Sequence, residues 1–198
     1  MKQLLVLASI GLCLASTCIA QAPASSPEID ADQQDSAEAG QTSALDELTW
    51  MVGKWVDQGE DTTITTDCSW THNGKFLSRS FQVTSSGELT LAGTQVIGWD
   101  PIEGQIRSWT FDSEGGFGSG RWIRDGDRWL VKTSFVLAGG ERASAINVLT
   151  YVDADTLRWQ STNREIAGEL QPNILEVTVV RQRSEETESC ESDKETNR

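Results

Sequence analysis

Residues 115–122, GGFGSGRW, nearly match G-x-x-x-x-G-K-[ST], the glycine-rich loop that cradles nucleotide phosphates. That loop leads from a strand into a helix, because the amino end of the helix must face the phosphate. Here the flanking segments QIRSWTF and RWIRD are both typical of strands, and the lysine and hydroxyl positions hold Arg121 and Trp122. Asp112 and Glu114 would also repel an anion. We therefore predict a hairpin whose glycines permit a sharp bend or a close approach of strands.

Other groups that could do chemistry are sparse. His72 is the single histidine, and its surroundings, THNGK, are typical of a hairpin tip. A Ser-His-Asp triad would need that histidine inside the protein, and a zinc site would need more cysteine or histidine ligands. Most carboxylates fall in turn segments, although Asp112 follows Trp109 and Phe111 at the end of a strand. We expect no catalytic pair and no metal site, and an enzyme is the less favoured interpretation.

Two arginines share the alternation of aromatic residues. Arg79 is in phase with Phe81, and Arg107 is in phase with Trp109. If those phases face inward, both guanidinium groups enter the interior, where a buried charge needs a partner. That partner would be an internal acid or the carboxylate of an apolar ligand. We name Arg79, Arg107, Trp109 and Asp112 as candidate ligand-binding residues, while the opposite orientation of the same phase stays open.

The elements that must position these residues are strands. Apolar residues recur with a period of two through most of residues 53–181, and they are rich in valine, threonine and aromatic side chains. Turn signals such as HNGK, SSGE, SEGG and RDGD separate these runs. Only ALDELTWMVG resembles a helix, of one or two turns. The pattern favours an all-β fold of about ten strands with a short N-terminal helical turn, either an up-and-down antiparallel barrel or a sandwich. We predict the barrel, because it removes exposed edges.

The two ends of the chain differ from this core. Residues 1–20 combine Lys2, an apolar run and a small-residue ending at Ala20, which is typical of a secretory signal peptide. Residues 21–44 and 183–198 are acidic and poor in apolar residues, so we expect a disordered linker and a disordered tail around a barrel at residues 45–182. The mature chain would be exported, periplasmic or extracellular, with no membrane insertion.

Net charge limits the classes of binding partner, and the cysteine content limits the possible disulfides. The formal net charge is −14, and a nucleic-acid partner needs a basic footprint, so we expect no nucleic-acid binding. We expect a monomer or a weak dimer. Removal of the signal peptide leaves Cys68 and Cys190. They either form a disulfide or remain a buried apolar residue and a free thiol, and the sequence leaves both open.

A family resemblance rests on both ends of the core. Gly53 and Trp55 form a Gly-x-Trp on the first strand, and Arg181 ends the last one. This pairing resembles the calycins, the superfamily of lipocalins, fatty-acid-binding proteins and nitrobindin-like barrels. The resemblance implies that the tryptophan closes the base of the barrel while the arginine packs across it. Nitrobindin-like barrels hold haem through an internal histidine, which is absent here, so we expect no cofactor.

A closer resemblance covers the whole core. GTQVIGWDP, IRSWTFDSEGGFG and GDRWLVK are similar to a bacterial exported domain of unknown function with a lipocalin-like barrel, often found downstream of SnoaL-like domains. We therefore expect an exported barrel that binds a small hydrophobic or aromatic molecule, with an acidic group as an option. A SnoaL-like or cyclase-like enzyme and a non-catalytic envelope protein that acts through its surface are the alternatives.

Overall fold

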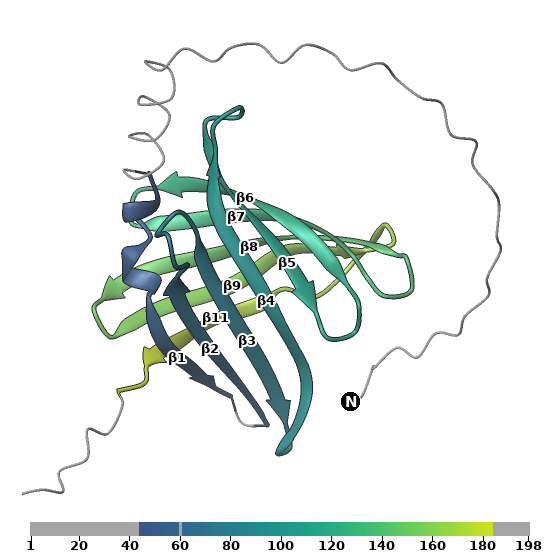
Figure 1. The fold of residues 1–198 in the computed structure, drawn as a ribbon. Coiled ribbons are helices and arrows are strands. Elements are labelled where there is room, and N and C mark those ends of the chain that lie inside the picture. The colour runs from purple at the N-terminus through teal and green to yellow at the C-terminus, as the bar shows by residue number, and fades with distance from the viewer. Residues whose placement is uncertain (1–43, 60, 184–198) are drawn as a thin grey trace, which may run out of the picture.

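The computed structural model describes residues 44–59 and 61–183 (Figure 1). Residues 44–46 are helical, and Thr49–Met51 form the 3-10 helix η1. The strands that follow are β1 (Gly53–Gln58), β2 (Thr62–Trp70), β3 (Leu77–Ser85), β4 (Glu88–Asp100), β5 (Gln105–Asp112), β6 (Phe117–Asp125), β7 (Arg128–Val136), β8 (Arg142–Asp153), β9 (Thr156–Ile166), β10 (Glu169–Leu170) and β11 (Ile174–Arg181). The predicted signal peptide, nearly all of the linker and tail, and Cys190 lie outside the described residues.

The strands form one antiparallel sheet that closes on itself. Each strand from β1 to β9 pairs with the next, β9 pairs with β11, and β11 pairs with β1. Ten strands complete this ring, and the two-residue β10 adds only to β9. The predicted all-β barrel of about ten strands is confirmed. Closure leaves no long edge strand with unpaired backbone groups.

Tight turns connect the strands where the sequence signals them. Between β3 and β4, Ser86 and Gly87 both have positive φ, at 52° and 84°. This is the requirement of a two-residue type I′ turn, whose twist matches that of the flanking strands. At the glycine-rich stretch, β5 leads through a turn directly into β6, a strand. The strand-to-helix geometry of a phosphate loop is therefore not formed there.

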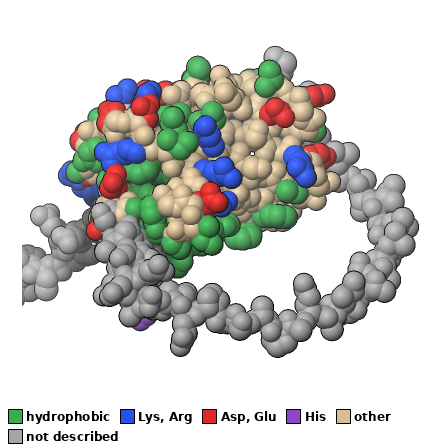
Figure 2. Space-filling view, turned by 90° about the horizontal axis from the view of Figure 1, so that it is seen from above, with side chains coloured by type: hydrophobic (Ala, Val, Ile, Leu, Met, Phe, Trp, Pro, Cys, Tyr) green, Lys and Arg blue, Asp and Glu red, His purple; other side chains and the backbone are tan. Residues whose placement is uncertain are grey.

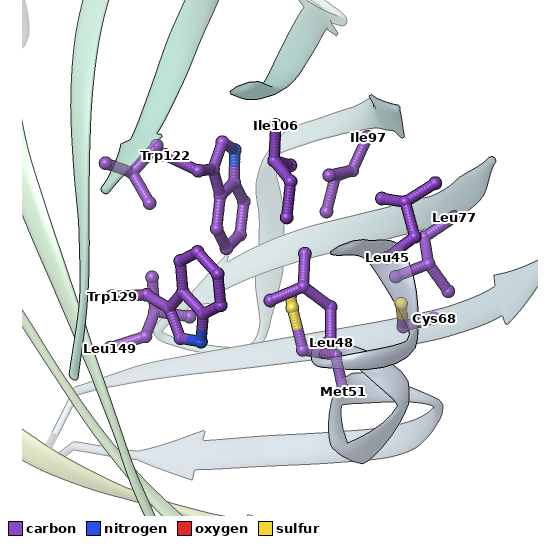
Figure 3. Packing of buried hydrophobic residues seen from close by; sticks show 11 residues of the cluster. Leu45, Leu48, Met51, Cys68, Leu77, Ile97, Ile106, Trp122, Trp129 and Leu149 are labelled. Carbon is purple, nitrogen blue, oxygen red and sulfur yellow. The ribbon is translucent and has the colours of Figure 1, made fainter. Parts of the chain in front are cut away.

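The N-terminal helical segment fills one end of the barrel, which we call the closed end (Figure 1). Leu45, Leu48 and Met51 point into a cluster of buried side chains that the strands supply (Figure 3). Among these, Trp122 and Trp129 meet edge to face, with ring centroids 6.1 Å apart. Aromatic pairs in this geometry contribute about 0.5–1.5 kcal/mol beyond the area that they bury.

Gly53, Trp55 and Arg181 meet at the seam between β1 and β11. The Arg181 guanidinium lies 4.1 Å from the centroid of the Trp55 ring, and the Trp55 indole donates a hydrogen bond to the Met51 carbonyl at 2.8 Å. Arg181 donates to the carbonyl oxygens of Val52 and Trp50 at 2.5 and 3.1 Å. Gly53 has φ of 124°, and a Cβ there would collide with the Arg181 guanidinium. The glycine of the Gly-x-Trp pattern is therefore required because no side chain fits between β1 and Arg181.

The outer surface mixes charge and apolar groups. In Figure 2, acidic, basic and hydrophobic side chains are interspersed over the face seen from above. Among the described residues, no helix is long and apolar enough to cross a membrane.

Candidate ligand cavity

A cavity of about 460 Å³ occupies the barrel interior. All ten strands of the ring contribute to its wall, because inward-facing residues come from each strand. Apolar side chains form most of its lining, and they are Met51, Trp55, Ile64, Cys68, Phe81, Val83, Trp122, Val131, Phe135, Leu137, Ala143, Ala145, Leu149, Leu157, Trp159, Ile166 and Val179. Its volume falls within the roughly 300–1,000 Å³ typical of small-molecule pockets.

Glycines on two strands help to leave this space. A Cβ on Gly118 would meet the Phe135 ring and lie 2.5 Å from the Ser134 carbonyl oxygen. A Cβ on Gly93 would likewise meet the Phe81 ring. Each phenyl ring therefore lies over a glycine of the neighbouring strand and stays close to the wall. The sequence signal for this was the run of glycines at residues 115–120, whose role as strand glycines is close packing.

Arg79 is the candidate site residue that the structure places in the cavity wall. It projects from β3, and its Nη2 donates to the Thr66 hydroxyl at 3.4 Å while its Nη1 donates to Gln95 Oε1 at 3.5 Å. Gln95 Nε2 then donates to Thr110 at 3.2 Å and to Ser108 at 3.4 Å. These five side chains form a band across β2, β3, β4 and β5, which we call the polar band.

The electrostatic setting of Arg79 is that of a cation without a counter-ion. Arg79 makes no ion pair within residues 44–59 and 61–183, and burial lowers its pKa. Cys68 lies directly opposite Arg79 in the β2–β3 register and is 2% exposed. Burial raises the pKa of the Cys68 thiol to about 11, although Arg79 acts in the opposite direction. The thiol is therefore neutral at pH 7 and does not compensate the arginine charge.

Two acids, Asp57 and Glu165, also line the cavity, and Asp57 is the less exposed of the two. Asp57, on β1, makes no hydrogen bond or ion pair with another described residue, and partial burial raises the pKa of its carboxyl group. Sequence reasoning missed Asp57 because it weighed acids by their distance from turns and not by strand phase. Asp57 is two residues after Trp55, so the alternation of β1 places both on the inner face.

Arg107 and Trp109 do not line the cavity, so of the two orientations that the sequence left open for β5, the outward one holds for them. Their neighbours Ile106 and Ser108 are buried, at 4% and 1% exposure, while Trp109 is 37% exposed on the outer face. Arg107 instead pairs with Asp100 at 3.4 Å. The inward-facing set of β5 is therefore Ile106, Ser108 and Thr110, of which Ser108 and Thr110 accept hydrogen bonds from Gln95.

Asp112 also lies outside the set of cavity-lining residues. Its carboxylate accepts hydrogen bonds from the backbone amides of Glu114 and Gly116 at 3.0 and 2.7 Å. It therefore stabilises the β5–β6 turn, as aspartates at turn starts commonly do. His72 is exposed and lies in the turn between β2 and β3, and no group of three potential metal-ligating side chains occurs among the described residues.

Comparisons with known proteins do not point to a function. No family model matches the chain, and no curated protein matches it. Among solved structures, it is similar to the crystal structure of Rv2717c from M. tuberculosis, with 16% sequence identity and a TM-score of 0.48. The match covers 71% of this chain and 98% of that chain. The basis for a functional proposal is therefore the cavity itself.

Proposed function

We propose that this protein is an exported, lipocalin-like barrel that binds a small, mostly apolar molecule through an acidic group held at Arg79. The observation that carries the proposal is a partly buried guanidinium, without an acidic partner among the described residues, in the wall of a mostly apolar cavity. Removing a charge from water costs free energy unless an opposite charge or hydrogen bonds replace the lost hydration. A ligand carboxylate would supply both.

The polar band gives this anion further partners. Arg79 reaches Thr66 and Gln95 only at 3.4 and 3.5 Å, so both of its contacts are long for hydrogen bonds. A carboxylate seated between these groups would accept shorter, charge-assisted bonds from the guanidinium fork. The apolar wall would then cover the rest of the molecule. Arg107 and Trp109 have no place in this revised contact set.

The test is direct binding with a matched pair of variants. Purified barrel should bind lauric acid in a fluorescent-probe displacement assay, and methyl laurate, which lacks the charge, should bind much more weakly. Arg79→Gln should weaken lauric acid binding at least about thirtyfold, since losing one partner of a buried charge pair costs about 2–5 kcal/mol. Arg121→Gln, an exposed arginine on β6, is the control. Equal affinities for the acid and its ester would refute the proposal.

Asp57 is the observation that favours a catalytic alternative. A carboxyl group with a raised pKa inside a cavity is the arrangement that general acid–base catalysis uses. The enzyme hypothesis expects the bound molecule to be converted, and Asp57→Asn to abolish that conversion. Mass spectrometry of the molecules that co-purify with wild type and with Asp57→Asn would decide: identical ligands in both exclude turnover at this residue.

A further inference from the structure

We propose that the cavity is built for a ligand with two polar ends: an acidic group at Arg79 and a hydrogen-bond donor, a hydroxyl or ammonium group, at Asp57. This inference rests on the proposed binding function and names the ligand class more narrowly. It follows from two oppositely charged side chains, Arg79 and Asp57, that line one cavity and do not pair with each other. The other two charged lining residues, Arg164 and Glu165, lie near the end of β9, where Arg164 donates to the Pro172 carbonyl oxygen at 2.7 Å and Glu165 is exposed.

The strand registers give the spacing of the two groups. Arg79 pairs with Cys68, which pairs with Gly53 on β1. Asp57 pairs with Ile64, which pairs with Val83 on β3. Asp57 is therefore four residues further along the strands than Arg79, toward the end opposite η1. At about 3.3 Å per residue this is about 13 Å, too far for an ion pair and suited to an extended chain between the two groups.

The surroundings of Asp57 make its carboxylate selective. Ile64 opposite it and Val83 beyond are apolar, and both line the same cavity. A plain hydrocarbon end placed there would remove water from the carboxylate without replacing its hydrogen bonds. A site that leaves its own polar group unpaired rejects such a ligand, often by large factors. A ligand with a terminal hydroxyl or ammonium group would instead satisfy Asp57.

The two ends of the cavity also differ in what they can hold. Near Arg79 the wall supplies donors and acceptors from the polar band, and at the closed end beyond it the wall is formed by Met51, Trp122 and Leu149. Asp57 lies on the other side of the polar band. The hydrocarbon chain of a ligand would pass Phe81 and Val83 to reach it. The anion is therefore held deep in the barrel, and the donor end lies further from the closed end.

The experiment compares lauric acid, ω-hydroxylauric acid and ω-aminolauric acid on the same protein. Wild type should bind the two ω-substituted acids at least about tenfold more tightly than lauric acid. Asp57→Leu should remove this preference, mainly by tightening lauric acid, while Arg79→Gln should weaken all three ligands. Asp67→Leu, an exposed aspartate on β2, should keep the preference and serves as the control.

The outcomes separate the two proposals. Lauric acid binding that depends on Arg79 but is as tight as ω-hydroxylauric acid binding would overturn the two-ended ligand and leave the proposed function in place. A preference that survives in Asp57→Leu would overturn the assignment to Asp57. Failure of all three acids to bind wild type would overturn the proposed function itself. Because the preference is first measured in wild type, it does not depend on the folding of any variant.

Discussion

At the scale of single residues, the cavity wall contains ionisable groups that are partly or fully removed from water. Arg79, Cys68 and Asp57 all have pKa values shifted toward their neutral forms, and burial is the largest cause for each. Two of them, Arg79 and Cys68, face each other across β2 and β3. A barrel filled by apolar side chains alone would avoid this cost, which is why these residues are the candidates for ligand contact.

Cys68 should make folding stability depend on alkaline pH. Its pKa is about 11 in the folded protein against 9.0 for an exposed thiol, so above pH 9 the unfolded chain loses a proton that the folded chain retains. Stability should therefore fall between about pH 9 and pH 11, by roughly 2–3 kcal/mol. Urea denaturation across this range would measure it, with Cys68→Ala expected to show a shallower decline. Parallel curves for the two proteins would contradict the assignment.

Gly118 offers a test of the close packing that leaves the cavity open. Gly118→Ala places a methyl group against the Phe135 ring and the Ser134 carbonyl oxygen, and a backbone carbonyl in a sheet cannot move aside easily. We expect a loss of about 1–3 kcal/mol in the free energy of unfolding. Ser119→Ala, on the outer face of the same strand, should change it by less than about 0.5 kcal/mol. Equal effects would show that the interior at Gly118 is not tightly packed.

At the scale of elements, β1 and β11 carry the seam of the barrel. They share few residues in their ladder, since only two register pairs join them, Trp55 with Arg181 and Val56 with Val180. Side-chain bonds from Arg181 add to this short ladder and reach Trp50, Val52 and Ala154. One arginine thus connects the last strand to the N-terminal helical segment, to β1 and to the β8–β9 turn.

Arg181→Lys tests the seam while keeping the charge. Lysine has no planar fork, so it can neither serve three carbonyl groups in this geometry nor stack on Trp55 as well. We expect a loss of about 2–3 kcal/mol in the free energy of unfolding. The control is Arg158→Lys, an exposed arginine paired with Glu176, where the expected change is below about 1 kcal/mol. Similar losses in both variants would show that the guanidinium group of Arg181 does not stabilise the seam more than an exposed arginine does.

At the scale of the whole molecule, a ligand in the cavity would touch most strands of the ring and would bind only the folded state. Such a ligand stabilises the fold by mass action, by about 2.7 kcal/mol when its free concentration is a hundred times the Kd. We expect lauric acid or an ω-substituted analogue to raise the thermal midpoint of wild type in calorimetry, and Arg79→Gln to show little shift at the same concentration. A shift of the same size with methyl laurate would argue against recognition of charge.

The amino-acid sequence by itself determined the class and closure of this fold. Its period-two alternation, its turn signals and the pairing of a Gly-x-Trp with a terminal arginine all act locally or depend on strand order, so they can be recognised without coordinates. The structure places Trp55 and Arg181 in contact across the seam, with Gly53 beside them.

Only the tertiary structure decided which face of each strand is the interior. A period of two defines two faces without stating which one is buried, so Arg79 on β3 points inward while Arg107 on β5 points outward. That choice depends on the volume that all the other strands place inside the ring, which no single segment of sequence contains. For the same reason, the sequence did not identify Asp57 or the polar partners of Arg79 as residues that line one cavity.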